Sequence, residues 1–218
     1  MGSITRSLSN NITTGGVILP AGITNSSVSA VTSFANASGG TLILLSTQTA
    51  SASATISFTT GLDSTYDEYI FKFINVRPAT DNVSFTFNFS TDAGSNYNVT
   101  KTTTFFQAVH TEADASVLEY KSNLDLAQST SFQSMGDALG NGADENLSGT
   151  MQIFNPSSTT YVKHFITRAN YAYFDEGSFD VNIAGYGNTT SAVNAIRFQM
   201  SSGNIADGIF KLYGVKKS

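Results

Sequence analysis

The residues of this chain best suited to acid–base chemistry are three pairs of adjacent carboxylates. The pairs are Asp67-Glu68, Asp144-Glu145 and Asp175-Glu176. A glycoside hydrolase needs two carboxyl groups held about 5 to 9 Å apart across a sugar-sized cleft. Each pair is contiguous beside an expected turn, where a solvated charge is the ordinary interpretation, and the chain has no Trp to form a sugar-stacking platform. We therefore expect no catalytic residues and no enzyme, unless the fold brings two distant carboxylates together.

Nucleophilic and metal chemistry find equally little support. The chain has two histidines, His110 and His164, and no G-x-S-x-G motif, so a Ser-His-Asp arrangement has no local signature. We expect both histidines to be packed or surface residues of strands. Because cysteine is absent, disulfides, thiolate metal sites and a cysteine nucleophile are excluded. These observations predict no cofactor.

The oxygen-rich segment 137–146 is the nearest approach to a cation site. It contains Asp, Asn, Gly and Glu, but it lacks the alternating D-x-[DN]-x-[DN]-G order of a calcium-binding loop. A plain surface loop is therefore favoured. Gly185 and Gly187 do not form a phosphate-binding loop, since no helical pattern follows them.

One aromatic group has the character of a binding surface. Tyr171, Tyr173 and Phe174 stand directly before the charged turn 175–177. They could form a ligand-binding patch at one end of a sandwich, although core filling or a contact between subunits is the favoured interpretation.

Composition narrows the range of partners. Charged residues make up 12 % of the chain and the net charge is −5, which argues against a nucleic-acid partner because phosphate neutralisation needs clustered Lys and Arg. The longest apolar runs, such as 42–45, are far below the roughly 20 residues that span a bilayer. No pattern of a secretory signal is seen. We expect a soluble protein, made in a cytoplasm, with no membrane association.

The N-terminal segment is almost free of charge. Between Met1 and Leu62 the only charged side chain is Arg6. Disordered tails usually carry more charge than this, so an extended arm that docks on another protein is favoured over a floppy tail. The residues we expect to bind the partner or the arm's own symmetry mates are Ile4, Arg6, Leu8, Asn10, Asn11, Ile12, Val17, Ile18 and Leu19. The first apolar residues would also suit a short helix, but the run 9–11 is a poor helix former.

The rest of the chain has the pattern of β-strands. Residues 69–76 are almost continuously apolar, which predicts a central strand buried on both faces for much of its length. Residues 83–90 alternate cleanly, with four apolar side chains on one face. The turn 92–95 and the following run 97–106 predict a hairpin with that strand.

Further strands follow after a less regular region. Residues 112–146 are the least strand-like part and predict short helical or irregular pieces. The later segments with strand patterns are 147–154, 161–169, 178–185, 193–201 and 208–215. With about eight to ten strands and no helices between them, the pattern is typical of an antiparallel sandwich or barrel.

Four stretches resemble a known group of proteins. Residues 1–17 resemble the N-terminal segments of small virion proteins from tailed phages, particularly marine ones. Residues 66–81 and 89–97 resemble the opening strands of phage jelly-roll structural proteins, and residues 208–215 are similar to their final strand. The resemblance implies a non-enzymatic part of the virion that is often homotrimeric.

Together these observations predict an all-β protein. Residues 51–218 would form an antiparallel jelly-roll-like β-sandwich, and residues 1–50 an extended N-terminal arm for docking or oligomerisation. The arm would anchor a decoration protein, knob or short fibre to capsid, portal-proximal or tail components of the virion. As an alternative, the loops 112–146 and 170–178 would bind a receptor or a host surface glycan, as in a tail fibre module.

Overall fold

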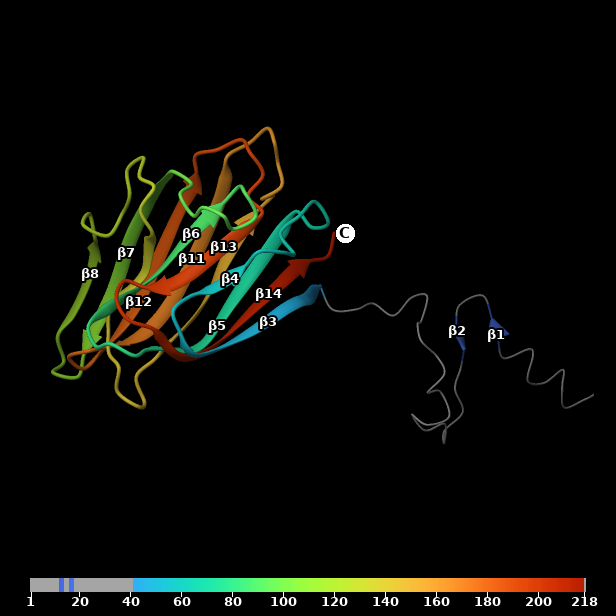
Figure 1. The fold of residues 1–218 in the computed structure, drawn as a ribbon. Coiled ribbons are helices and arrows are strands. Elements are labelled where there is room, and N and C mark those ends of the chain that lie inside the picture. The colour runs from blue at the N-terminus through green and yellow to red at the C-terminus, as the bar shows by residue number, and fades with distance from the viewer. Residues whose placement is uncertain (1–11, 14–15, 18–40, 218) are drawn as a thin grey trace, which may run out of the picture. The chain divides into compact units, whose positions relative to one another are not determined.

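The computed structural model describes residues 12–13, 16–17 and 41–217, and every regular element within them is a β-strand (Figure 1). The chain divides into two units, residues 1–39 and 40–218. In the first unit, β1 (Ile12–Thr13) and β2 (Gly16–Val17) form an antiparallel pair in which Ile12 is opposite Val17. All other strands belong to the second unit, which is the β-sandwich.

The strands of the sandwich follow one another with antiparallel pairing throughout. They are β3 (Leu42–Ser53), β4 (Ile56–Phe58), β5 (Glu68–Pro78), β6 (Val83–Ser90), β7 (Lys101–Thr111), β8 (Ser116–Tyr120), β9 (Gln133–Leu139), β10 (Leu147–Phe154), β11 (Lys163–Tyr173), β12 (Gly177–Gly187), β13 (Ala195–Met200) and β14 (Ile205–Val215).

These strands form a large sheet and a small sheet that meet at one residue pair. The large sheet has the order β3-β14-β5-β10-β11-β12-β7-β8, and the small sheet has the order β4-β13-β6-β9. The pairing of Tyr173 with Leu139 joins β11 to β9 and makes the arrangement nearly closed. Strands β3 and β8 lie at opposite edges of the large sheet (Figure 1).

The strand order is that of a jelly roll with two insertions. Strands β3, β5, β10 and β14 lie in one sheet and β4, β6, β9 and β13 in the other, so the chain passes repeatedly from one sheet to the other. Eight strands connected in this way are the arrangement of a jelly roll. The insertions β7–β8 and β11–β12 extend the large sheet beyond β10. The predicted all-β, jelly-roll-like sandwich is confirmed, with 12 strands in the joined sheets rather than eight to ten.

The core is built around phenylalanines from both sheets. Phe198 of β13 is completely buried, and its ring centroid lies 5.0 Å from that of Phe73 and 5.4 Å from that of Phe71. Three further rings, those of Phe58, Phe85 and Phe210, lie within 6.3 Å of it. Most of these contacts are edge-to-face, the arrangement that aromatic quadrupoles favour. The alternating phenylalanines of β5 and β6 thus fix the spacing of the two sheets.

Burial of the two central strands differs from the prediction. In β5 only one face is buried, since Phe71 and Phe73 are fully covered whereas Ile70 and Ile74 are half-buried. In β6 both faces are buried, including the side chain of Asn88. The second face of β6 is covered because the segments around Tyr97 and Thr130 fold over it and accept hydrogen bonds of 2.8 Å from Asn88 Nδ2.

The predicted hairpin between residues 83–90 and 97–106 is wrong. Strand β6 pairs with β13 and β9, whereas β7 joins the large sheet between β12 and β8. The turn after β6 leads the chain across the small sheet instead of back along β6. The prediction for residues 112–146 is wrong for residues 116–120 and 133–139, which form strands β8 and β9. The remainder of this region is irregular, as predicted, and none of its residues is helical.

The sandwich begins earlier than the predicted boundary at residue 50. Strand β3 pairs with β14 from Leu42, opposite Val215, to Ser53, opposite Ile205. Residues 42–50 are therefore part of the large sheet and not of an arm. The second unit starts at Gly40.

Candidate functional site

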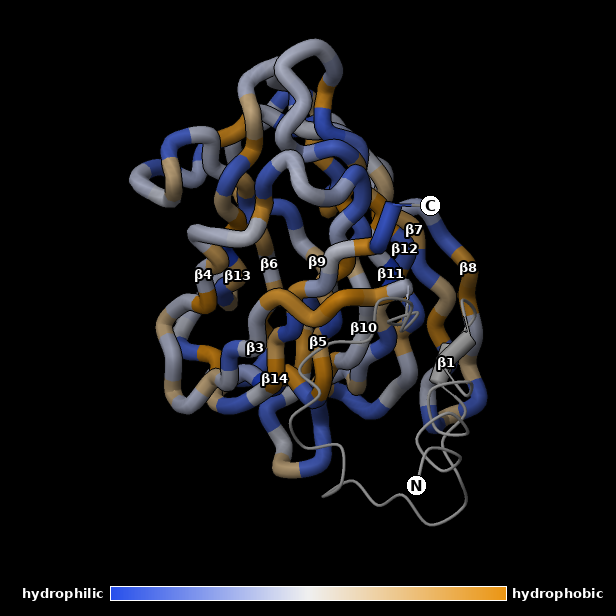
Figure 2. The backbone as a smooth tube through the Cα atoms, turned by 90° about the vertical axis from the view of Figure 1, so that its right-hand side faces the viewer, coloured by the Kyte–Doolittle hydropathy of each residue, from blue (hydrophilic) through white to orange (hydrophobic). Residues whose placement is uncertain are grey.

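The start of β3 is an exposed, uncharged sheet edge. Among the described residues, β3 pairs with β14 alone, and the short strand β4 reaches its other side only near Gln48, whose Nε2 donates to Ser57 O at 2.8 Å. Leu42, Leu44 and Leu45 are 37 %, 53 % and 36 % exposed. The strand contains no charged residue and no proline, the usual protections of an edge. In Figure 2 the start of β3 is coloured as hydrophobic. This edge is suited to contact with another polypeptide.

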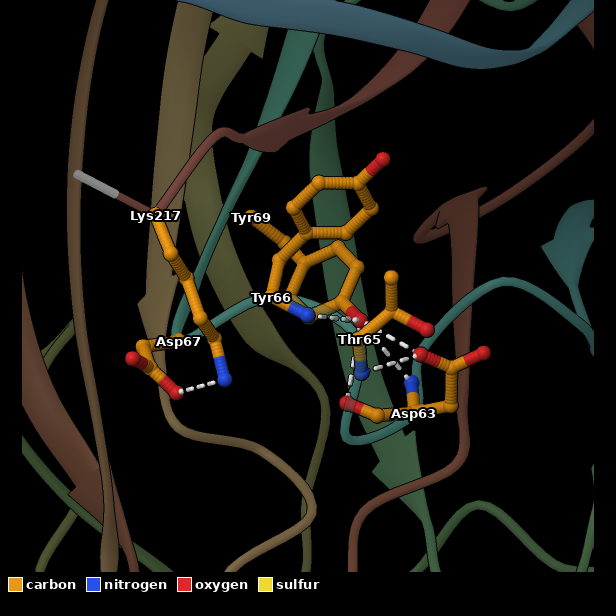
Figure 3. Close-up of polar contacts among 6 residues, drawn as sticks. All are labelled: Asp63, Thr65, Tyr66, Asp67, Tyr69 and Lys217. Atoms are coloured by element: carbon orange, nitrogen blue, oxygen red, sulfur yellow. Dashed lines mark hydrogen bonds and ion pairs between the residues drawn. The ribbon is translucent and has the colours of Figure 1, made fainter.

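The chain enters β3 beside a rigid group of side chains (Figure 3). The hydroxyl of Tyr69 lies 2.9 Å from both the carbonyl oxygen and Oδ1 of Asp63, and Asp63 Oδ1 also accepts from Thr65 N–H at 2.8 Å. Lys217 forms an ion pair of 2.9 Å with Asp67 in the same loop. Because Lys216 N donates to Thr41 O at 2.8 Å, the loop 63–67 and the last described residues are held close to the start of the sandwich. Thr41, the first described residue of the sandwich, is therefore held by Lys216 next to the last strand.

Most of the predicted arm residues lie outside the described part of the chain. These residues are Ile4, Arg6, Leu8, Asn10, Asn11, Ile18 and Leu19. Ile12 and Val17 are described as backbone partners in the β1–β2 pair. Their roles in docking remain predictions.

A second candidate site is a pocket at the β8 edge of the large sheet, which we call the edge pocket. One row of directly paired residues crosses four strands, with Val117 opposite Val109, Val109 opposite Phe179, and Phe179 opposite Tyr171. Paired residues point to the same face of a sheet, so this row forms a continuous apolar floor. The floor passes from open to buried: Val117 is 48 % exposed, Phe179 is 9 % exposed and Tyr171 is 2 % exposed.

Strand β9 and polar side chains of β7 and β8 complete the edge pocket. Its volume is about 280 Å³, and its lining residues are Gln107, Val109, Val117, Glu119, Lys121, Asp137, Ala138, Tyr171, Tyr173 and Phe179. Ala138 has a φ of 53°, in the left-handed region that costs a residue with a Cβ of the order of 1 kcal/mol. Such strain is often found at functional positions. Around this residue the pairing of β9 with β6 shifts register, and Asp137 and Ala138 form one wall of the pocket.

The predicted ligand patch is partly brought into this pocket. Tyr171 lines it at its buried end, where the hydroxyl accepts from Asp137 N–H at 3.1 Å, and burial raises the pKa of this phenol. Tyr173 also lines it, and its ring stacks on Phe179 with a centroid distance of 4.4 Å. Phe174 contacts the ring of Tyr173 but is not among the lining residues. Tyr171 is therefore a core residue rather than an open binding surface.

The sequence analysis missed the other lining residues. Gln107 and Glu119 are paired across β7 and β8, and their side chains form a hydrogen bond of 2.9 Å. The turn residues around Asp114, between two short alternating runs, were the available signal for this hairpin. Phe179 gave no local signal, because only the pairing of β12 with β7 places it beside Val109.

Comparison of the chain with protein families, with curated proteins and with solved structures gives no match. The arguments about function therefore rest on the residues and on the fold.

Two lysines are buried without a carboxylate partner. Lys101 and Lys163 are both fully buried and stand on either side of Gly187 in one row of the large sheet. Lys101 Nζ donates to Asn88 Oδ1 at 2.5 Å and to Val99 O at 2.8 Å. Burial lowers the pKa of Lys101 to about 7 and also lowers the pKa of Lys163. These two contacts tie β7 of the large sheet to Asn88 on β6 of the small sheet and to the loop that precedes β7.

Two of the three carboxylate pairs considered for catalysis are brought together, because Asp144, Glu145 and Glu176 line one pocket of about 400 Å³ with Glu112. The two histidines and Asp67 are not among its lining residues. His110 is exposed beside Asp114, at 3.2 Å, and His164 is exposed beside Tyr186. Asp67 is engaged by Lys217, and Glu145 accepts from the N–H of Gly142 at 2.5 Å. Within residues 41–217, no group of three or more acidic, histidine or cysteine side chains has the arrangement of a metal site. That part of the chain also contains no helix able to cross a membrane.

Proposed function

We propose that this chain is a non-enzymatic structural protein of a tailed-phage virion. The N-terminal segment anchors it to the capsid or the tail, and the jelly-roll sandwich projects as a decoration, knob or short fibre. Its partners are other virion proteins and further copies of itself, as a homotrimer. The observation that carries this proposal is the exposed edge of β3, which follows directly on an N-terminal segment with a single charged side chain.

The edge of β3 supports an assembly role, because an unpaired strand edge of this composition promotes aggregation unless another polypeptide covers it. A long, apolar, uncharged edge offers unpaired backbone groups to any other strand and promotes aggregation. The sequence keeps charge out of residues 7–62, so the segment and the edge form one continuous uncharged stretch. Burying hydroxyl and amide groups in hydrogen bonds costs little, whereas burying unpaired charges is expensive. A protein surface that is covered in an assembly has this composition.

The contacts at the start of the sandwich add a second argument. The side-chain group around Tyr69 and the Thr41–Lys216 hydrogen bond hold the start of the sandwich in place. In a symmetric trimer, three such N-terminal segments act together, which strengthens weak individual contacts.

Deletion of residues 2–40 tests the anchoring role. We expect the shortened protein to keep its cooperative unfolding transition, because residues 40–218 form a separate unit, but to be absent from purified particles. The measurement is the copy number per particle, with the full-length protein supplied in parallel as the control. Incorporation of the shortened protein at normal occupancy would contradict the proposal.

Charge placed on the edge of β3 tests self-association. Leu44→Lys is expected to weaken the homo-oligomer at least about tenfold. Leu44 is exposed in the single chain, and in the proposed oligomer a partner would cover it, so the substitution would bury a charged side chain in the interface. Sedimentation equilibrium measures the change. The matched control is Leu118→Lys on β8, at the opposite edge of the large sheet, where the leucine is 75 % exposed. Equal effects of the two variants, or no effect of Leu44→Lys, would argue against β3 as the interface.

A further inference from the structure

Two lysines face each other on the outer side of the large sheet, and we call them the lysine pair. Lys72 of β5 is directly opposite Lys211 of β14 in the antiparallel pairing of these strands. Their chain neighbours Phe71 and Leu212 are buried in the core, so both lysines point away from it. Like charges directly opposite one another on a sheet are destabilising. A negatively charged partner would remove this repulsion.

Within the described part of the chain, no carboxylate forms an ion pair with either lysine. Lys72 Nζ lies 5.4 Å from the centroid of the Tyr213 ring, but an aromatic face carries no net charge. The lysines and arginines that do have a carboxylate partner are Arg77, Lys121, Arg168 and Lys217. The lysine pair is therefore a positive surface without a counter-charge among the described residues.

The lysine pair lies beside an apolar row that begins at the β3 edge. In this row Leu44 is opposite Tyr213, and Tyr213 is opposite Ile70. Leu44 is 53 % exposed, and the other two side chains are half-buried. Ile70 and Tyr213 each stand two positions from a lysine on the same strand, so the row and the lysine pair share one face of the sheet. A partner that covers the β3 edge would therefore lie next to both lysines.

Carboxylates without an ion-pair partner gather at one end of the sandwich, which we call the acidic end. Its residues Glu112, Asp144 and Glu176 are exposed and line one pocket of about 400 Å³. They come from three turns, between β7 and β8, between β9 and β10, and between β11 and β12. None of the three forms an ion pair with another described residue. The single chain thus presents a negative and a positive surface that do not neutralise each other.

We propose that in the homo-oligomer the acidic end of one copy binds the lysine pair of the next copy. This inference rests on the proposed self-association, because it names the surface of the neighbouring copy that lies beside the β3 edge. Two different surfaces meet, so the contact is heterologous, and in a trimer it closes into a ring. Complementary charges at the border of an interface set the orientation of the partners, while the apolar row supplies contact area.

Reversal of the charges on either surface tests this contact. The first variant combines Lys72→Glu with Lys211→Glu, and the second combines Asp144→Lys with Glu176→Lys. We expect each of them to weaken self-association of the full-length protein at least about tenfold in sedimentation equilibrium. The two variants change the net charge in opposite directions, so a loss in both does not come from the net charge.

A protein that carries all four substitutions is the decisive control. Its charges are complementary again, so we expect its association constant to return to within about threefold of the native value. Circular dichroism verifies that each variant is folded. Should the first variant fail to fold, Lys72→Gln with Lys211→Gln removes the charges without reversing them and is expected to weaken association at least about threefold. Unchanged association in either charge-reversal variant, or no recovery in the combined protein, would overturn the proposal.

The outcomes separate this inference from the proposed function. Dissociation by Leu44→Lys with native association of the charge-reversal variants would overturn the contact and leave the proposed function standing. A native protein that stays monomeric would overturn the contact and the homotrimer, whereas the deletion of residues 2–40 still tests anchoring separately. Loss of the first variant from particles with unchanged self-association would show that another virion protein, and not a second copy, covers the lysine pair.

Discussion

Phe198→Ala is expected to lower the free energy of unfolding by about 3–5 kcal/mol. Phe198 is completely buried between the sheets and contacts rings from β4, β5, β6 and β14. Truncation to alanine removes the apolar transfer energy of the ring and leaves a cavity whose walls come from four strands. Because both sheets contribute to those walls, the site is poorly able to collapse around the smaller side chain, which places the cost in the upper part of this range.

Chemical denaturation followed by fluorescence or circular dichroism measures this loss. Phe174→Ala is the control, because Phe174 is 36 % exposed and stands outside the central cluster. We expect its effect to stay below about 1 kcal/mol. Phe198→Leu keeps most of the volume and should lose clearly less than the alanine variant. A loss of under about 1.5 kcal/mol for Phe198→Ala would contradict the assignment of this ring as the centre of the core.

The sequence predicted the fold best where alternation and burial agree. In residues 83–89 the alternating valine and phenylalanines mark one face of a strand, and that face is buried in the core. The sequence did not predict which strands pair with it. The turn after Ser90 fits a hairpin locally, but the fold places β6 between β13 and β9, because sheet partners depend on contacts far away in the chain.

Strand β9 shows why the region 112–146 was misread. Its sequence, Gln-Ser-Met-Gly-Asp-Ala-Leu, has no period-two alternation of apolar residues. Its residues are nevertheless mostly buried, since polar side chains such as Gln133 find partners: Gln133 Oε1 accepts from Thr103 Oγ1 at 2.6 Å. The polar side chains of such a strand form hydrogen bonds with residues far away in the sequence. The strand therefore lacks the alternation of apolar and polar residues by which strands are predicted.

For the candidate sites too, the sequence indicated single groups of residues but not the strands that lie beside them. Tyr171 and Tyr173 were recognisable as an aromatic group, and both line the edge pocket. The polar side chains of this pocket come from β7, β8 and β9 and from Lys121. The turn around Asp114 indicates that β7 and β8 pair, but nothing in the local sequence indicates that β9 lies beside them. The open edge of β3 was foreseen only as part of an uncharged segment, because exposure of Leu44 depends on which strands lie beside it.

Lys101 is expected to make the stability of the sandwich depend on pH in the alkaline range. Burial lowers its pKa from 10.5 to about 7, so between these values the unfolded chain binds a proton that the folded chain does not. The free energy of unfolding therefore rises with pH from about 7 to about 10.5. The full difference of pKa corresponds to about 5 kcal/mol, since one unit is about 1.36 kcal/mol. Hydrogen bonds to Asn88 Oδ1 and Val99 O favour the ammonium form, so we expect about 2–4 kcal/mol.

Lys101→Met isolates this contribution from that of other titrating groups. Methionine fills a similar volume without a charge, so the stability difference between the native protein and Lys101→Met should shift in favour of the native protein as the pH rises from 7 to 9.5. Urea denaturation at several pH values measures the two free energies. Lys216→Met is the control, because Lys216 is exposed and its removal should leave the pH profile unchanged.

The direction of this shift distinguishes a buried amine from a buried ion pair. A lysine held by a carboxylate would have a raised pKa, and its stabilising effect would be lost as the pH rises through that value. Lys101 has instead an amide and a carbonyl oxygen as acceptors, neither of which carries a compensating charge. Lys163, in the same row, donates to Tyr161 O at 2.6 Å and to Thr189 O at 3.2 Å. Burial lowers its pKa as well, so it also makes the free energy of unfolding rise with pH. A native protein that loses stability relative to Lys101→Met on going from pH 7 to 9.5 would show that Lys101 is charged in the folded sandwich.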